Sequence, residues 1–534
     1  MLNDYLRREQ VMGNLDADFS FNYRPILTEK AFPEFSNPFL LDSADGYTNK
    51  QPGFLPDKKA LKISLLPIQK TTVFNASHPY GWGNGAMVPA RGLQTLVSAG
   101  VHIKSGPLSI QLYPQFHYAQ NLPFEEYAPD APREFFLAMR RDNLGTELPV
   151  RHGNKSITQF LPGNSNVMLN FGAFSAGVST ENIWWGPGQF HSLLLSDNAE
   201  GFLHATLKTS KPAKTFLGNF EGQFFMGRLE RFGGPHFSDS AYTDILPIKE
   251  EDNWRYFTGL SFSYAPKWIK GLSVGFSRTF QVYREDMRDN LRAWFPVFDP
   301  LPKEGLGLIE NIELREDQHV AVFARFVLPK AQTEFYLEYI RNDHALNWRD
   351  FVLNPEQSRG YLMGFNKIFS IPSGHNFMIR AEMNHTQIPL NNIIRARGEG
   401  VGIYYNGSVR QGLTNKGQTL GSGAGQSGNH YIFELSHFEG FNRYGIHLGR
   451  HAREQNFYYN AIYRGVELLP WVDLIGGVFA ERKIKNLLLE VHLKGIKSKN
   501  YNWDLDRTMM NIDGFLYGRD RGNFHTMLKV AYIL

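Results

Sequence analysis

The sequence contains no cysteine among its 534 residues. This absence excludes disulfide bonds, thiolate metal sites and cysteine nucleophiles, and it suits a protein that passes through an oxidising compartment without forming wrong bridges. The chain also lacks a strong charge excess, because 56 Lys and Arg residues stand against 52 Asp and Glu residues. Nucleic-acid-binding domains usually carry a strongly basic surface, so we expect no nucleic-acid partner.

Long apolar runs are missing as well. No segment approaches the roughly 18 to 20 consecutive apolar residues that a membrane-spanning helix requires, which excludes insertion by helices. The start of the chain, MLNDYLRREQVMGNLDADF, lacks the basic and apolar regions of a signal peptide. We therefore expect either a cytosolic protein or a mature chain to which Met1 has been added.

Alternation of apolar and polar residues dominates what is present. A two-residue period over about ten residues is the signature of a strand with one apolar and one polar face. The segment GPLSIQLYPQFHYAQ shows it, with apolar residues at Leu108, Ile110, Leu112, Pro114, Phe116 and Tyr118. Aromatic residues form 14% of the chain and charged residues 20%, a composition that indicates a folded protein.

The alternation and the turn residues predict about eighteen strands, and bacterial outer-membrane barrels usually have an even number. The predicted strands lie near residues 60–73, 91–104, 107–119, 165–177, 183–195, 202–210, 215–229, 254–265, 271–283, 318–328, 332–342, 359–369, 376–386, 430–438, 443–451, 470–481, 487–498 and 523–534. The last strand alternates to its end through Leu528, Val530, Tyr532 and Leu534, as is common in such barrels.

Connections between these strands alternate in length. Tight ones at 105–107, 265–271, 329–332 and 370–374 contrast with long segments at 120–164, 230–253, 284–317, 386–429 and 499–522. Short turns on one rim and long loops on the other are typical of an outer-membrane barrel. We predict an all-β fold, a transmembrane antiparallel barrel over residues 59–534, preceded by a small helical or irregular segment, residues 1–58, that is periplasmic or plugs the barrel.

The inward positions of the predicted strands carry charges of both signs, which predicts a lumen crossed by ion pairs. Arg278 departs from the pattern, because it shares parity with apolar Val274, Phe276 and Phe280; a bulge or a position near the membrane interface would explain it. The residues assigned to the lumen network are Arg325, Glu334, Glu338, Arg380, Glu382, Glu490 and Lys494.

Three patterns resemble cofactor, metal or catalytic sites, but a structural role explains each of them better. Gly423, Gly425 and Gly428 have a dinucleotide-binding spacing but do not lie between a strand and a helix, so we expect no cofactor. His447 and His451 share parity on one strand, yet their Cα atoms would be about 13 Å apart, so we expect lumen histidines and no metal site. The carboxylates of REDMRDNLRAW (284–294) suit a solvated, partly helical loop.

Two features suit an acidic polysaccharide. The loop 386–430 combines cations with aromatic rings, which charge pairing and stacking on sugars would use, although an ordinary loop is an equal alternative. In Trp184-Trp185-Gly186-Pro187-Gly188 the proline and glycines force the chain to bend or leave the wall, so the tryptophans either buttress the interior or stack on sugar. The predicted glycan-binding residues are Trp184, Trp185, Arg395, Arg397, Tyr404, Tyr405 and Arg410.

The block ENIWWGPGQFHSLLLSDNAEGFLHATLKTSKP resembles the diagnostic block of the capsule assembly Wzi family. Further stretches are similar to the family, namely NDYLRREQVMGNLDADFSFNYRPI, HPYGWGNGAMVPARG, APKWIKGLSVGFSRTFQ, FYLEYIRNDHALNWRDF and GLTNKGQTLGSG. The resemblance implies an eighteen-stranded barrel with a small helical periplasmic part, no enzymatic activity and a lectin-like association with surface glycan. Only the tryptophan block is carried over, as a signature without an assigned role.

These observations predict a non-enzymatic protein in the outer membrane of a Gram-negative bacterium. It would bind or organise exported surface polysaccharide, capsular or exopolysaccharide, and would contact outer-membrane lipid or lipopolysaccharide and other envelope proteins. The alternatives are an outer-membrane transport channel, a barrel enzyme acting on lipid or glycan, and a scaffold subunit of an envelope complex.

Overall fold

The structure is a computed structural model that describes residues 1–17, 19–26, 61–142, 146–239, 253–299, 315–342, 348–353, 355–372, 374–389, 402–510 and 516–533. None of the helices in these ranges is long and apolar enough to cross a membrane. Residues 27–58 of the predicted N-terminal segment and residues 59 and 60 of the predicted barrel lie outside the described residues, as do Arg395 and Arg397.

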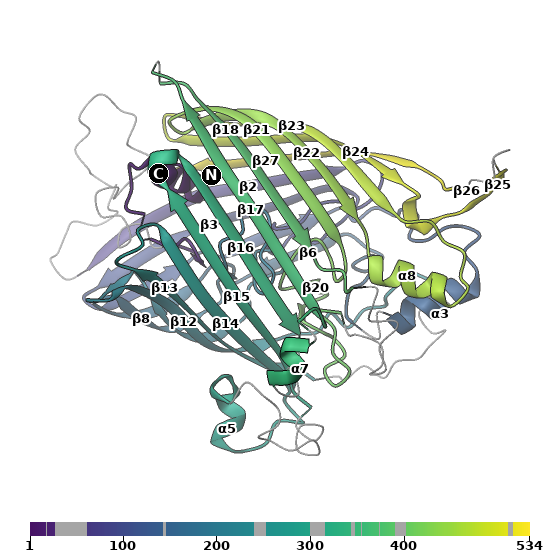
Figure 1. Ribbon diagram of the computed structural model, residues 1–534, viewed down its shortest axis with the longest axis horizontal. Helices are drawn as coiled ribbons and strands as arrows, with labels where there is room; N and C mark the ends of the chain where they lie inside the picture. The colour runs from purple at the N-terminus through teal and green to yellow at the C-terminus, as the bar shows by residue number, and fades with distance from the viewer. Residues whose placement is uncertain are drawn as a thin grey trace.

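A closed antiparallel barrel of eighteen wall strands forms the body of the protein (Figure 1). Three wall strands are interrupted, so that β4 with β5, β6 with β7, and β10 with β11 each form one strand of the wall, and pairing of β2 with β27 closes the barrel. The segments of the wall are β2 (Lys62–Asn75), β3 (Gly92–Ser105), β4 (Leu108–Leu112), β5 (Gln115–Ala119), β6 (Ile157–Leu161), β7 (Asn166–Phe171), β8 (Phe174–Ser179), β10 (His204–Thr209), β11 (Ala213–Lys214), β12 (Gly218–Leu229), β13 (Arg255–Pro266), β14 (Leu272–Tyr283), β15 (Asp317–Leu328), β16 (Thr333–Asn342), β17 (Arg359–Ser370), β18 (Asn376–His385), β21 (Asn429–Glu439), β22 (Asn442–Ala452), β23 (Val472–Ile484), β24 (Leu487–Lys499) and β27 (Arg521–Tyr532).

Short elements lie in the connections and inside the barrel. The helices are α1 (Leu2–Met12), α3 (Arg133–Asp142), α5 (Leu291–Trp294), α7 (Trp348–Leu353) and α8 (Gln455–Tyr463), with single 3₁₀ turns η3 (Pro296–Phe298), η5 (Pro329–Ala331) and η7 (Tyr501–Trp503). Two-stranded pairs are formed by β1 (Tyr23–Arg24) with β9 (Trp184–Trp185), β19 (Thr414–Asn415) with β20 (Gln418–Thr419), and β25 (Asp506–Met510) with β26 (Leu516–Tyr517).

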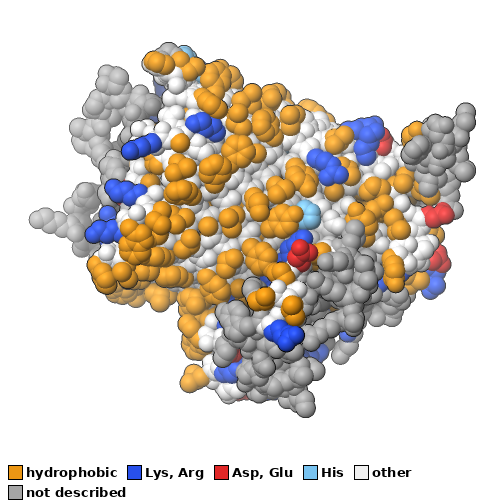
Figure 2. Space-filling view, viewed as in Figure 1, with side chains coloured by type: hydrophobic (Ala, Val, Ile, Leu, Met, Phe, Trp, Pro, Cys, Tyr) orange, Lys and Arg blue, Asp and Glu red, His pale blue; other side chains and the backbone are white. Residues whose placement is uncertain are grey.

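The outer wall is apolar and the inner wall is polar. Along β16, Phe335 and Leu337 point outward and are exposed, whereas Glu334, Tyr336 and Glu338 are buried inside. Figure 2 shows hydrophobic side chains spread over the strands on the visible face. An apolar outer band is what hydrocarbon requires of a transmembrane barrel, so the protein is an outer-membrane protein.

The two rims differ as the sequence predicts. Eight connections are short, at 106–107, 172–173, 215–217, 267–271, 329–332, 371–375, 440–441 and 485–486, and the nine others span sixteen residues or more. Figure 1 places the N-terminus at the short-turn rim, whereas α3, α7 and α8 lie at the long-loop rim. The short-turn rim is therefore periplasmic and the long-loop rim extracellular.

The strand predicted at 183–195 is wrong. This segment lies inside the lumen, and the missing wall strand arises because the predicted strand at 165–177 is really two, β7 and β8, joined by a turn at Gly172, whose φ is +58°. A continuous apolar run such as Leu193-Leu194-Leu195 resembles a strand in sequence, but here it packs on all sides inside the barrel.

Arg278 lies on the outer wall without a bulge in the pairing of β14 with β13 and β15. The extracellular segment that follows β14 folds back over it. The Arg278 guanidinium donates to the carbonyl oxygens of Val297, at 3.2 Å, and Asp299, and to Oε1 of Gln318 at 3.1 Å. An outward arginine is tolerated here because a loop shields it from hydrocarbon.

A substitution at Gly100 on β3 tests how closely this strand packs against the interruption between β4 and β5. A Cβ atom there would lie 1.8 Å from the carbonyl oxygen of Leu112 and 2.9 Å from Cα of Tyr113. We expect Gly100→Ala to destabilise the barrel by about 1–3 kcal/mol, the usual range for overpacking. Thermal unfolding in detergent measures the effect, with Gly476→Ala as control because open space surrounds Gly476; equal stability of the two variants would contradict this packing.

Candidate functional site

The N-terminal helix α1 lies against the inner wall at the periplasmic rim. Its residues Tyr5 to Val11 are all buried. The Tyr5 ring stacks on Phe441 with centroids 4.9 Å apart, and the Arg8 guanidinium donates to the carbonyl oxygen of Gly440 at 3.2 Å. Because Gly440 and Phe441 form a periplasmic turn, these contacts fix the helix inside the mouth of the barrel.

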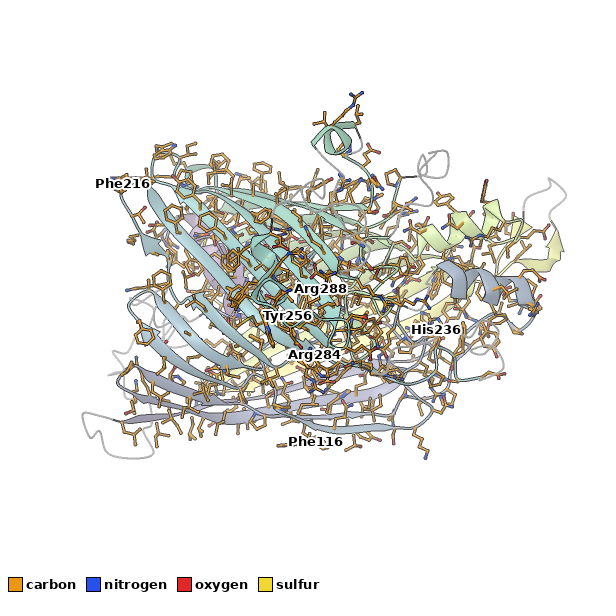
Figure 3. All side chains as sticks on the ribbon, turned by 90° about the horizontal axis from the view of Figure 1, so that it is seen from below. Phe116, Phe216, His236, Tyr256, Arg284 and Arg288 are labelled. Carbon is orange, nitrogen blue, oxygen red and sulfur yellow. The ribbon has the colours of Figure 1, made fainter. Side chains whose placement is uncertain are left out.

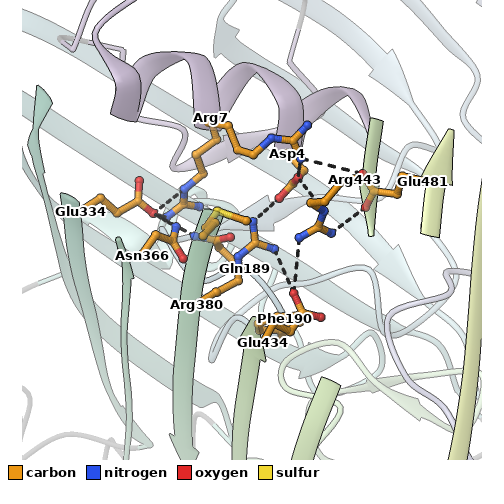
Figure 4. A network of polar contacts seen from close by, with 12 residues as sticks. Asp4, Arg7, Gln189, Phe190, Glu334, Asn366, Arg380, Glu434, Arg443 and Glu481 are labelled. Atoms are coloured by element: carbon orange, nitrogen blue, oxygen red, sulfur yellow. Dashed lines mark hydrogen bonds and ion pairs between the residues drawn. The ribbon is translucent and has the colours of Figure 1, made fainter. Parts of the chain in front are cut away.

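Glu334 joins this helix to the wall (Figure 4). The Arg7 Nε atom donates to Glu334 Oε1 at 2.7 Å, and the Arg325 guanidinium donates to Oε2 at 2.5 Å. The side-chain amides of Asn366 and Gln189 donate to Oε1 at 2.8 and 2.9 Å. Arg325 and Glu334 thus form a wall ion pair, and the third member, Arg7, comes from the N-terminal segment.

Asp4 is the centre of a second network. Its carboxylate contacts the guanidinium groups of Arg8 and Arg380 and lies 3.8 Å from Arg443 Nε. Burial alone would raise the pKa of Asp4, but these positive groups hold the pKa well below its ordinary value. Arg443 also pairs with Glu481 at 2.6 Å, so the helix is attached to the wall through alternating charges.

Trp184 and Trp185 lie in the lumen as strand β9, paired with β1 of the N-terminal segment. Trp185 is 2% exposed, and its indole N–H donates to Gln223 Oε1 at 2.9 Å. The Arg24 guanidinium lies over the Trp184 ring at 4.4 Å and donates to the carbonyl oxygen of Gly188 at 2.8 Å. The tryptophans therefore hold two inserted segments together, as a buttress would.

Two wall carboxylates bind the backbone of the tryptophan segment. Glu382 accepts the N–H groups of Gln189, Phe190 and His191 at 2.7, 3.2 and 2.8 Å. Glu338 accepts those of Gly188 and Leu193 at 2.9 and 2.8 Å. Both were expected in ion pairs; their partners are mainly backbone N–H groups instead, which a sequence pattern of charges cannot reveal.

Glu490 and Lys494 are not paired with each other. Glu490 Oε1 lies 3.0 Å from His492 Nε2 and 4.0 Å from Lys529 Nζ. The Lys494 ammonium lies 5.3 Å from the ring centroid of Trp82, a cation–π contact. Both residues were predicted as members of the lumen ion-pair network; Glu490 lies beside His492 and Lys529, and Lys494 lies beside the Trp82 ring.

The loop that follows β18 enters the lumen from the extracellular side. Tyr404 is fully buried, donates its hydroxyl to the carbonyl oxygen of Leu193 at 2.6 Å and accepts the Ser422 N–H at 2.8 Å. Tyr405 is partly exposed and Arg410 exposed. The structure thus separates the predicted glycan residues, with Trp184, Trp185 and Tyr404 inside and Arg410 at the surface.

The glycine pattern of this loop serves packing. A Cβ atom at Gly423 would lie 2.3 Å from Trp82 Cβ, and one at Gly428 would lie 1.9 Å from the carbonyl oxygen of Ala424. The same carbonyl accepts from His451 Nε2 at 3.0 Å, whereas His447 Nδ1 lies 3.1 Å from Glu434 Oε1. The two histidines thus have separate partners.

A cavity of about 330 Å³ remains between the N-terminal segment and the inner wall. Its lining mixes the charged groups described above with aromatic rings, among them Tyr80, Trp82, Trp184 and Phe190. The His191 ring of the tryptophan segment contacts the His430 ring of β21, with ring nitrogens 2.9 Å apart. Burial lowers the pKa of His191 to about 3. The cavity is therefore a space inside the barrel whose lining is both charged and aromatic.

The extracellular rim carries a helical platform that the sequence pattern did not predict. Helices α3 and α8 lie side by side there (Figure 1), joined by buried rings such as Phe135 and Phe457, whose centroids are 5.5 Å apart. Tyr459 is partly exposed and Tyr463 is 74% exposed, one helical turn further along α8. The i, i+4 spacing of two tyrosines in QNFYYNAIY was the available signal.

Known proteins share both the sequence pattern and the fold of this chain. The family model described as capsule assembly protein Wzi matches residues 96–461, and no curated protein sequence matches. A solved structure of Wzi, an outer membrane protein involved in group 1 capsule assembly in Escherichia coli and a carbohydrate-binding β-barrel, is similar with a TM-score of 0.61 and 12% identity, covering 100% of this chain and 98% of that one.

Porins are more distant. A BenF-like porin from Pseudomonas fluorescens Pf-5 gives a TM-score of 0.39 at 8% identity, covering 90% of this chain and 100% of that one. OprD from Pseudomonas aeruginosa gives 0.38 at 7%, covering 90% and 95%.

Removing the Glu382 carboxylate tests its hold on the tryptophan segment. In Glu382→Ala three backbone N–H groups lose their acceptor, at a cost of about 1–3 kcal/mol, so we expect amide exchange at Gln189, Phe190 and His191 to accelerate by roughly tenfold or more. Hydrogen exchange in detergent measures this. Glu439→Ala, at an exposed carboxylate, is the control; unchanged exchange in Glu382→Ala would show that other contacts hold the segment.

Proposed function

Because the chain belongs to the Wzi family of capsule assembly proteins, we propose that it binds exported polysaccharide at the cell surface without altering it chemically. The polymer is a capsular or exopolysaccharide. The bound partner touches the extracellular loops, and the barrel anchors those loops in the outer membrane.

The main support for this proposal is that inserted segments of the chain fill the lumen. The N-terminal segment, residues 180–203 and the loop 402–428 all pack inside the wall, and their apolar residues form a buried core that includes Trp185, Leu194, Tyr404 and Leu420. A transport channel needs a continuous aqueous path, as porins have. A barrel filled in this way supports binding over transport.

The extracellular platform offers the chemistry for weak polymer contacts. Tyr459 and Tyr463 present rings on α8, and Arg410 and Lys155 are exposed cations on other described extracellular loops. Aromatic rings and cations suit the apolar faces and carboxylates of an acidic polysaccharide. Repeated weak contacts along one long polymer give a high overall affinity.

We also propose a division of the chain into two parts. Residues 1–58 form the plugging unit, and residues 59–534 form the barrel. Outer-membrane lipid surrounds the apolar wall, and other envelope proteins that export the polymer lie nearby. The contacts of α1 with the periplasmic turn at Gly440 support the plugging role of the first residues.

A deletion strain tests the function directly. We expect cells without this protein to release polysaccharide into the medium while synthesising a normal total amount, because attachment is lost and not synthesis. Fractionation of cell-bound and free polymer measures the ratio. Unchanged retention, together with no binding of the polymer by purified protein, would refute the proposal.

The α8 tyrosines provide a test at residue level. We expect Tyr459→Ala with Tyr463→Ala to weaken polymer binding, since each ring contributes about 1 kcal/mol of apolar contact, or roughly thirtyfold for the pair. The matched control replaces both residues with Phe, which keeps the rings and removes the hydroxyls. Immobilised polymer and surface plasmon resonance measure binding; equal affinity of the Ala pair and the wild type would place the glycan contacts elsewhere.

A further inference from the structure

The extracellular segment 284–299 folds against the outside of the barrel and not over its mouth. The Tyr256 hydroxyl donates to the carbonyl oxygen of Trp294 at 2.7 Å, and the two rings lie 5.3 Å apart. Phe224 contacts Phe295 and Phe298 with centroids 6.1 and 6.0 Å apart. Figure 3 shows Arg284 and Arg288 beside Tyr256 on this side of the wall.

The wall beneath this segment is the hydrocarbon-facing surface. Phe224 lies opposite Leu260, Leu260 opposite Arg278 and Arg278 opposite Val320 on adjacent strands, and directly opposite residues share one face of a sheet. The other face, which includes Gln223 and Phe225, points into the lumen. The segment therefore occupies space that lipid would otherwise fill.

The segment 284–299 extends along the wall from the extracellular end of β14 toward the membrane. Arg278 lies five residues before Tyr283, the last residue of β14, which is about 17 Å along the strand. The apolar band of such a barrel is about 25 Å tall, and its strands tilt by about 40°. The carbonyl groups of Val297 and Asp299 that bind Arg278 therefore lie at the level of the outer leaflet.

The second half of the segment, residues 291–298, exposes apolar side chains, whereas the first half exposes charged residues, among them Glu285, Arg288 and Asp289. Leu291 is 80% exposed and Phe298 is 65% exposed, and Trp294 and Phe295 are also exposed. Three of its carboxylates have an arginine partner: Asp299 lies 2.9 Å from Arg292, Asp289 lies 3.6 Å from Arg284, and Asp286 lies 2.8 Å from Arg315. Tryptophan, phenylalanine and leucine beside charged groups are typical of interfacial membrane segments.

We propose that residues 284–299 form a lipid-inserted anchor, in which Leu291, Trp294, Phe295 and Phe298 contact acyl chains of the outer leaflet and the carbonyl groups behind them satisfy Arg278. Arg278 acts as the latch of the anchor. If the segment left the wall, this guanidinium would face hydrocarbon and lose the two carbonyl acceptors that the segment supplies, which is costly. The partner is a lipid surface, and the anchor extends the apolar band around β12–β15.

The cysteine-free chain allows a direct test. Phe298→Cys is labelled with an environment-sensitive fluorophore in phosphatidylcholine vesicles, and quenching by spin-labelled acyl chains is compared with quenching by aqueous iodide. We expect acyl-chain quenching to exceed that of a label at Lys155→Cys, on an exposed extracellular loop, by several-fold. A label at Leu337→Cys, on the outer wall, gives the value for full lipid contact.

A second variant tests the latch. Arg278→Met removes the charge and keeps an apolar wall, so the barrel should fold while the label at Phe298→Cys becomes more accessible to iodide. Iodide quenching at Phe298→Cys equal to that at Lys155→Cys would overturn the lipid anchor. Unchanged quenching after Arg278→Met would overturn the latch. Either comparison is independent of whether polysaccharide binds.

Discussion

Every charged group that points into the barrel must find a partner inside it, because an unpaired charge or backbone amide in a low-dielectric interior is costly. Several carboxylates on the inner wall lack sufficient hydrogen-bond donors on the wall itself. The inserted segments supply the missing donors. Glu334 needs Arg7, Glu382 needs three backbone N–H groups, and Asp4 of the helix needs wall arginines. Wall and plug are therefore one packed unit.

This constraint explains how the lumen of an eighteen-stranded barrel is filled with protein. A wall of that size would enclose water if its lumen were empty. Here the inserted segments form an apolar core toward the extracellular side and a charged network toward the periplasm. The filled interior leaves the extracellular loops as the surface on which we propose the contacts with polymer and with lipid.

The sequence predicts the wall well because lipid imposes a local rule, a two-residue period, on each strand. β14 to β18 are recovered almost to the residue for this reason. The interior obeys no local period: Trp184 and Leu194 pack among segments distant in the chain, so the tryptophan segment was mistaken for a strand. Glu338 and Glu382 lie in the lumen, as the alternation along their strands predicts. Their backbone partners could not be predicted, because they come from the distant tryptophan segment.

We propose that the packed lumen makes this protein a polysaccharide-binding protein and not a channel. The current across a planar bilayer that contains single molecules of the purified wild-type protein tests it most directly. Because the lumen is packed, we expect a baseline without steady open levels across the range of applied voltage. A stable ohmic current that rises with salt concentration would contradict it.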